Sequence, residues 1–159
     1  MEITFRPAEQ QDLAALVSML ADDKLGATRE DTSTPLNAAY LSAFDAINTD
    51  PNNELIVADL AGQLVGMLQL TFIPYLTHTG SWRCLIEGVR IHQAYRSQGL
   101  GQQLLRWAIE RARQRHCRLV QLTTDKQRPD AIHFYQALGF VASHEGMKLA
   151  LGAVDLCQI

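Results

Sequence analysis

The sequence has 159 residues, of which 47% are apolar and 19% are charged, and its formal net charge is −3. This length and apolar share suffice for one sizeable hydrophobic core, so we expect a single domain over residues 1–159. The acidic balance, with a pI near 5.9, indicates no nucleic-acid partner and no affinity for an anionic membrane. The N-terminus has no signal-like pattern and no apolar run approaches a membrane span, which favours a cytoplasmic protein.

Cysteine and arginine are the two residue types whose placement calls for comment. The three cysteines are widely spaced, which fits a reducing compartment and predicts neither a disulfide framework nor a metal site: Cys84, Cys117 and Cys157. Seven arginines fall within one short stretch: Arg90, Arg96, Arg106, Arg111, Arg113, Arg115 and Arg118. A basic helix hints at RNA, but in an acidic chain we favour a solvated helix face that also attracts a polyphosphate.

The N-terminal half predicts a strand, two helices and a hairpin. Alternation from Ile3 predicts a strand that ends at Pro7, and apolar residues at helical spacing then predict a helix over 13–20. A polar loop over 22–34 leads to a second helix, with Thr34 as its cap and Pro35 in its first turn. Two apolar runs joined by a short Gly-containing turn predict an antiparallel hairpin, over 55–60 and 64–73.

The C-terminal half predicts strands and helices in alternation. After a connection over 74–80, the expected elements are a strand (82–91), a helix (100–112), a strand (119–123), a helix (128–138) capped by Gly139, and strands over 140–142 and 147–151. The strand–helix–strand crossover at the centre implies a parallel pair inside a mostly antiparallel sheet. The predicted fold class is therefore α/β of the α+β type, with helices on both faces of a mixed sheet.

The turn between the strand over 82–91 and the helix over 100–112 carries the strongest motif. Gly99 and Gly101 lack a Cβ atom, so the backbone there can approach a ligand closely. The N-terminus of the following helix adds a positive dipole end, and the combination predicts a pocket for phosphate oxygens. The alternative is a turn in which the glycines only permit the bend.

The sequence Arg96-Ser97-Gln98-Gly99-Leu100-Gly101 resembles the acyl-CoA signature of the Gcn5-related N-acetyltransferases, in which Arg or Gln precedes two spaced glycines. The predicted element order is also similar to that family's over nearly the whole chain. The resemblance implies acetyl-CoA as co-substrate, with no metal. It implies that the turn binds the cofactor through Arg96, Ser97, Gln98, Gly99, Leu100, Gly101 and Gln102.

The strand over 82–91 would hold the thioester end of the cofactor. The resemblance implies a bulge, cheapest at Gly88, after which Val89 offers its N–H to the thioester oxygen and Ile91 pairs with the pantetheine arm. Glu87 lies in the same strand, where a carboxylate among apolar residues is costly unless it is partnered or functional. It is a candidate acceptor for the proton of the attacking amine. The alternatives are a solvated position, or an ion pair with Arg83 or Arg90.

The segment 131–140 resembles the C-terminal signature of the same family, in which Ala, Phe-Tyr and Gly-Phe recur at this spacing. The resemblance implies that Tyr135 protonates the leaving thiolate and that Phe134 lies along the cofactor; the alternative for Tyr135 is packing on a helix face. Many members carry Asn where this chain has Arg128; here Arg128 or Lys126 is expected to meet a phosphate of the cofactor or an anionic group of the acceptor. The run 124–135 resembles that of members acting on aminoalkylphosphonates.

These features together predict an acetyl-CoA-dependent N-acetyltransferase that acts on a small-molecule primary amine by direct attack in a ternary complex. One alternative is an acceptor on a protein or peptide, either an N-terminus or a lysine. Another is a non-catalytic acyl-CoA-binding regulatory domain. A ping-pong path through Cys84 lacks a neighbouring base in the sequence, and a homodimer stays open.

Overall fold

A computed structural model describes residues 2–152, so Cys157 lies outside the described residues. The chain consists of two compact units, Met1–Leu122 and Thr123–Ile159. That the two units act as one domain stays a prediction. No helix within 2–152 is long and apolar enough to cross a membrane.

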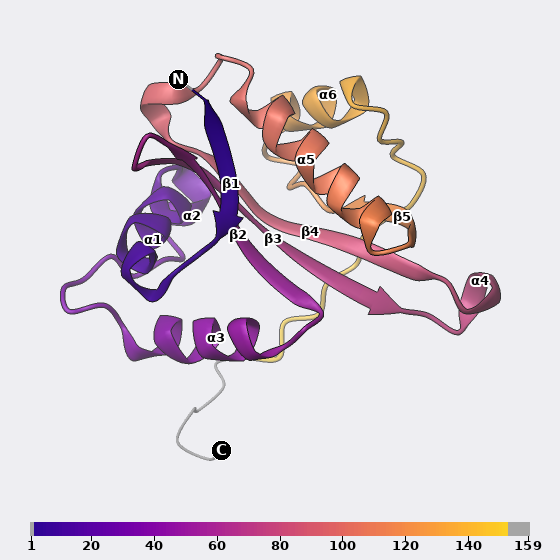
Figure 1. Cartoon of the computed structure of the whole chain (residues 1–159), viewed down its shortest axis with the longest axis horizontal. Coiled ribbons are helices and arrows are strands. Elements are labelled where there is room, and N and C mark those ends of the chain that lie inside the picture. Colours follow the sequence, from indigo (N-terminus) through magenta and orange to yellow (C-terminus); the bar gives the residue numbers. More distant parts are fainter. Residues whose placement is uncertain (1, 153–159) are drawn as a thin grey trace. The chain divides into compact units, whose positions relative to one another are not determined.

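The first unit is built on a five-stranded sheet in the order β1–β2–β3–β4–β5 (Figure 1). The strands are β1 (Ile3–Pro7), β2 (Asn53–Leu60), β3 (Gln63–Pro74), β4 (Trp82–Ile91) and β5 (Cys117–Leu122). Neighbours pair antiparallel, except that β4 and β5 run parallel. The predicted mixed sheet, its parallel pair and its hairpin are therefore confirmed, with β5 at the edge of the described sheet.

Helices cover both faces of this sheet, as expected (Figure 1). The helices α1 (Leu13–Ala21) and α3 (Ala38–Thr49) lie on one side, and α5 (Leu100–Gln114) lies on the other. The buried stripe of α5 has the three- and four-residue spacing of an amphipathic helix: Leu104, Leu105, Ala108 and Ala112. Shorter pieces connect these elements: η1 (Gln10–Asp12), α2 (Lys24–Ala27), α4 (Thr77–Gly80) and η2 (Gln93–Tyr95).

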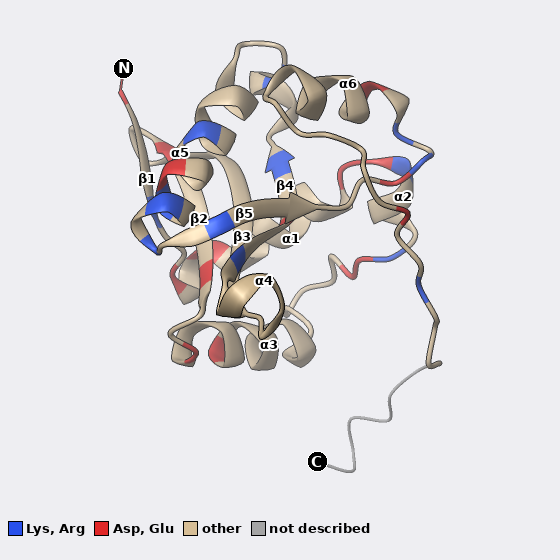
Figure 2. Ribbon diagram, turned by 90° about the vertical axis from the view of Figure 1, so that its right-hand side faces the viewer, with Lys and Arg blue, Asp and Glu red and all other residues tan. Residues whose placement is uncertain are grey.

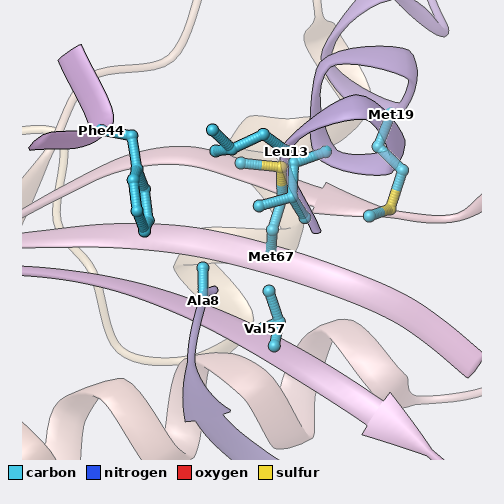
Figure 3. Close-up of a cluster of buried hydrophobic side chains, with 7 residues drawn as sticks. Ala8, Leu13, Met19, Phe44, Val57 and Met67 are labelled. Atoms are coloured by element: carbon cyan, nitrogen blue, oxygen red, sulfur yellow. The ribbon is translucent and has the colours of Figure 1, made fainter. Parts of the chain in front are cut away.

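A hydrophobic cluster fixes α1 and α3 to their face of the sheet (Figure 3). Its members come from five elements or the loops beside them, and all are buried: Ala8, Leu13, Leu16, Met19, Phe44, Val57 and Met67. Because Val57 and Met67 are directly opposite in the β2–β3 ladder, their side chains share this face. Val57 and Met67 therefore mark the face of the sheet against which α1 and α3 pack.

The second helix begins later than the sequence predicted. Asn37 caps α3, because its Oδ1 accepts a hydrogen bond from the Ala39 N–H at 2.9 Å, while Thr34 and Pro35 lie before the helix. The prediction of Thr34 as cap was therefore wrong, since Asn is an equally good cap nearer the first helical turn. The expected loop over 22–34 also contains α2, whose cap Asp23 accepts from the Gly26 N–H.

The second unit contains α6 (Pro129–Ala137), and Gly139 follows its C-cap Leu138, in the capping role that the sequence predicted. Gly139 has a φ of +95°, and its N–H donates to the Gln136 carbonyl at 2.9 Å. The Phe140 N–H donates to the Tyr135 carbonyl at 3.1 Å, which completes a Schellman motif. Two carbonyls of the last turn thus accept hydrogen bonds from Gly139 and Phe140, and the left-handed backbone of Gly139 makes both bonds possible.

The two final strands predicted from sequence, 140–142 and 147–151, are not formed in the part of the chain that the structure describes. The side chains that gave the alternating pattern are largely exposed: Val141, Met147, Leu149 and Leu151. The prediction failed because alternation supplies β propensity, whereas a strand also needs a partner edge to complete its hydrogen bonds.

Candidate active site

Strand β4 carries a bulge where the sequence predicted one. Met67 of β3 is opposite Arg90 and Gln69 is opposite Glu87, so the single residue Leu68 faces two residues of β4. These are Gly88, which has a φ of +61°, and Val89. Only glycine adopts this left-handed backbone without strain, so the bulge is fixed at this position by the sequence.

The bulge coincides with the point where β4 and β5 part. Their parallel ladder runs from Trp82 opposite Cys117 to Ile86 opposite Leu122, and β5 ends there. The rest of β4, from Glu87 to Ile91, therefore has no partner strand on that side within the ladder of the described sheet. The strands are therefore separated beside Val89 and Ile91, and the binding of pantetheine in this gap stays a prediction.

The turn before α5 exposes a helix N-terminus without a side-chain cap. Gly99 is the N-cap residue, with a φ of +79°, and the first bond of the helix joins the Gln103 N–H to its carbonyl at 3.2 Å. A Cβ atom placed on Gly99 would meet no atom within 4 Å, so the space in front of the turn is open. The first amide groups of α5 are thus directed toward the start of the helix, as an anion site requires.

Two details of this turn were not read from the sequence. Ser97 also has a left-handed backbone, with a φ of +61°, which is unusual for a residue other than glycine. Gly101, in contrast, is already inside α5. The bend therefore does not require glycine at this position, and close approach of a ligand to Gly101 stays a prediction.

Arg96 ties the turn to the end of α1. Its guanidinium donates to the Asp22 carboxylate at 2.8 Å and to the Asp22 carbonyl at 3.3 Å, and its Nε donates to the Ile91 carbonyl at 3.1 Å. Sequence reasoning missed Asp22, because a contact across 74 residues leaves no local signal. In this structure Arg96 holds the turn through its hydrogen bonds to Ile91 and Asp22, and contact with phosphate stays a prediction.

Glu87 is exposed and is included in none of the ion pairs formed within residues 2–152. Arg83 donates to the Gln121 side chain at 3.4 Å and lies 4.1 Å from the centre of the Tyr75 ring. The alternative of an ion pair between Glu87 and Arg83 or Arg90 is therefore not observed within the described residues. Nor is its carboxylate buried among apolar neighbours, because at the bulge β4 presents this position to solvent.

The remaining predicted site residues lie in the second unit. Tyr135 and Phe134 are half-buried on α6, with ring centres 5.2 Å apart, and Tyr135 also makes an edge contact with Phe140 at 5.9 Å. Arg128 immediately precedes α6, and Pro129 occupies its first turn. That these three residues act on the cofactor stays a prediction from the resemblance.

The basic stretch is partly neutralised by carboxylates. Arg111 and Arg115 both pair with Glu54, at 2.6 and 3.4 Å, and Arg113 pairs with Glu110 at 3.1 Å. On α5, Figure 2 shows an acidic position between basic ones, as expected for Glu110 between Arg106 and Arg111. Within the described range 2–152, no group of three or more His, Cys, Asp or Glu side chains could hold a metal ion.

Cys84 lies on β4 but is fully buried. Burial in an apolar environment raises the pKa of the Cys84 thiol to about 12, because the thiolate is poorly solvated there. A thiol in this state is a weak nucleophile at neutral pH, which argues against an acetyl-enzyme on Cys84.

Cys84 is expected to resist alkylation in the folded protein. Iodoacetamide at pH 8 should leave it unmodified under conditions that label the unfolded chain fully, as peptide mass spectrometry would show. Cys117 is half-buried and has a pKa that burial also raises, so it provides an internal comparison. Rapid labelling of native Cys84 with parallel loss of activity would restore the ping-pong alternative.

The sequence model of the family described as the acetyltransferase (GNAT) family matches residues 16–140. The chain belongs to this family. The match spans the turn at Gly99, the bulge at Gly88 and the helix that carries Tyr135, so the resemblance stated from the sequence is confirmed. As a GNAT enzyme, the chain is an acetyl-CoA-dependent N-acetyltransferase.

Proteins similar to this chain include two that are named as acetyltransferases. The aminoalkylphosphonate N-acetyltransferase of Salmonella typhimurium is 36% identical over 113 residues, 71% of this chain and 73% of the relative. A crystal structure from Bacillus halodurans, titled a transcriptional regulator, is 59% identical, with a TM-score of 0.91 over 94% of this chain and 99% of that one. An acetyltransferase of Trypanosoma brucei is 26% identical, with a TM-score of 0.75 over 94% and 100% of the two chains.

Proposed function

We propose that this GNAT enzyme acetylates the primary amine of a small molecule by direct attack within a ternary complex. The observation that carries the proposal is the juxtaposition on β4 of an exposed carboxylate, a bulge and a strand segment without a partner on the β5 side. The three features follow one another from Glu87 to Ile91. A thioester placed in the gap would therefore lie beside a group that accepts a proton.

The residues of the first unit fit an acyl-CoA. The uncapped start of α5 and the open space at Gly99 suit the phosphates, and the unpaired edge of β4 suits an extended amide arm. When bound, acetyl-CoA supplies the thioester carbonyl that the amine attacks. The Val89 N–H is proposed to donate to that oxygen as negative charge develops on it.

Two side chains are proposed to move the protons of the reaction. An alkylammonium has a pKa near 10, so it must lose a proton before its nitrogen can attack; Glu87 receives that proton directly or through water. Departure of the thiol requires a proton on sulfur, which the Tyr135 hydroxyl supplies. Because one group accepts a proton and the other donates one, the enzyme needs no covalent intermediate, in agreement with the buried state of Cys84.

The acceptor is proposed to be a small amine that carries an anionic group. The Salmonella relative is named for aminoalkylphosphonates, which have this character. The chain also has Lys126 and Arg128 before α6, where many members have a neutral Asn. An arginine binds the oxygens of a phosphonate or carboxylate by paired hydrogen bonds, so either residue is a candidate for the anionic end.

The proposal is tested by measuring release of free CoA from acetyl-CoA with a panel of amines. The panel contains 2-aminoethylphosphonate, aminomethylphosphonate, free amino acids, an aminoglycoside and a lysine-containing peptide. We expect turnover with small amines and the fastest with those that are anionic. Turnover with the peptide alone would favour a protein acceptor, and binding of acetyl-CoA without turnover of any amine would favour a regulatory domain.

The phosphate turn is tested separately by ligand-dependent stability. Acetyl-CoA at about 100 times its Kd should raise the Tm of the wild type by about 5–10 °C, because it binds only the folded chain. Gly101→Leu places a side chain over the first amides of α5 without requiring a left-handed backbone. We expect this variant to fold and to lose the shift.

The matched control is Gln103→Leu, which adds the same side chain at an exposed position of the same helix. It should keep the full shift in Tm. A normal shift in Gly101→Leu would mean that the phosphates bind elsewhere.

A further inference from the structure

Gln69 occupies a special position relative to Glu87. The two residues are directly opposite in the antiparallel β3–β4 ladder, at the last regular pair before the bulge. Directly opposite side chains share one face of a sheet, with Cβ atoms about 5 Å apart. An amide and a carboxylate therefore lie side by side where β4 leaves β5.

The Gln69 amide is held by a polar network along the same face of the sheet. Its Nε2 donates to Asn53 Oδ1 at 3.2 Å, and the Thr71 hydroxyl donates to the same oxygen at 2.7 Å. Asn53 is oriented in turn, because its Nδ2 donates to the Asp50 carboxylate at 2.7 Å. The network thus assigns the nitrogen and the oxygen of both amides.

This orientation leaves a hydrogen-bond acceptor beside Glu87. Gln69 is half-buried, and no hydrogen bond among residues 2–152 uses its Oε1. A half-buried carbonyl oxygen whose amide nitrogen is fixed is a preorganised acceptor for an N–H donor. No local pattern indicates this role, because in the sequence Gln69 is one polar residue of a predicted strand.

We propose that Gln69 binds the acceptor amine together with Glu87, as a two-point clamp for one nitrogen. The inference rests on the proposed function, since it requires an amine substrate at this site. The bound ammonium donates one hydrogen bond to Gln69 Oε1 and another to the Glu87 carboxylate. When the proton that is hydrogen-bonded to Glu87 passes to the carboxylate, the nitrogen gains a lone pair. It keeps its hydrogen bond to Gln69 Oε1.

The division of labour follows from the chemistry of the two groups. A carboxylate accepts a proton, whereas an amide oxygen accepts only a hydrogen bond at neutral pH. Gln69 therefore holds the nitrogen before and after proton loss, and limits rotation of the amine as it attacks. The clamp requires an N–H that remains on the nitrogen after proton transfer, which a primary amine provides and a tertiary amine does not.

The test compares Gln69→Met with Thr71→Val. The first removes the acceptor at nearly constant side-chain volume, and the second removes the other hydrogen bond to Asn53 Oδ1. Calorimetry measures binding of 2-aminoethylphosphonate to protein saturated with free CoA, a complex in which no reaction occurs. Steady-state kinetics with acetyl-CoA then gives the KM for the amine and kcat.

We expect Gln69→Met to raise both the Kd and the KM for the amine about tenfold, the usual effect of one hydrogen bond to a charged group. The KM for acetyl-CoA should not change, and Thr71→Val should bind the amine like the wild type.

Equal Kd values for Gln69→Met and the wild type would overturn the clamp, as would equal losses in both variants, which would assign the effect to the network. If the wild type neither binds nor acetylates any amine of the panel, the proposed function fails and the clamp with it. Failure of the clamp alone is recognised by a wild type that turns over an amine and a Gln69→Met variant with the same KM.

Discussion

Tyr135→Phe is expected to lower kcat about 100-fold while acetyl-CoA affinity stays close to that of the wild type. The substitution removes only the hydroxyl that is proposed to protonate the leaving thiolate. The ring contacts with Phe134 and Phe140, at 5.2 and 5.9 Å, are retained, so α6 should remain folded. The loss should therefore appear in the chemical step and not in binding.

The measurement is single-turnover transfer from acetyl-CoA, which separates chemistry from product release. Tyr95→Phe is a matched control, because it also removes one phenol oxygen and keeps the edge contact with His92. It should leave kcat unchanged. A Tyr135→Phe variant with wild-type single-turnover rate would show that this side chain only packs on α6 and that the thiolate leaves without it.

The features that the sequence predicted well have local causes. The bounds of β4 match the prediction residue for residue, because the segment is mostly apolar, with Arg83, Glu87 and Arg90 as its charged residues. The bulge was predictable because glycine tolerates the positive φ of the first of the two bulged residues, Gly88. The helix that begins at Leu100 follows from periodicity, and the Gly139 cap follows from backbone freedom.

The features that the sequence did not predict depend on partners far along the chain. The proposed role of Gln69 depends on its position opposite Glu87 in the β3–β4 ladder, and the role of Asp22 depends on its hydrogen bond from Arg96. The segment 147–151 has the alternation of a strand but forms none within the described residues, because propensity does not provide a partner edge. The start of α3 is a smaller case, because the loop before it contains two suitable capping residues, Thr34 and Asn37, and Asn37 caps the helix.

Glu87→Gln is expected to lower kcat/KM for the amine about 100-fold near pH 7 and to recover activity as the pH rises. If Glu87 receives the proton of the ammonium, its loss matters most where the amine is protonated. An alkylamine has a pKa near 10, so the neutral fraction grows about tenfold per pH unit below that value. The variant should follow this slope, whereas the wild type should reach its plateau at lower pH.

Because Glu87 is exposed, this substitution separates an effect on activity from an effect on stability. Since no ion pair within residues 2–152 includes the Glu87 carboxylate, Glu87→Gln should leave the free energy of unfolding nearly unchanged. Glu110→Gln is the control, because it removes an exposed carboxylate that pairs with Arg113 on α5. Its pH profile should match that of the wild type.

The shape of the profile distinguishes three roles for Glu87. If Glu87 is the proton acceptor, the activity of Glu87→Gln continues to rise at pH values at which the wild type has already reached its plateau. A group that only holds the ammonium gives a raised amine KM with kcat nearly unchanged, and the loss then persists at high pH because the contact is not restored. A solvated side chain without a function gives the wild-type profile, and that outcome would remove Glu87 and the clamp with Gln69 from the mechanism together.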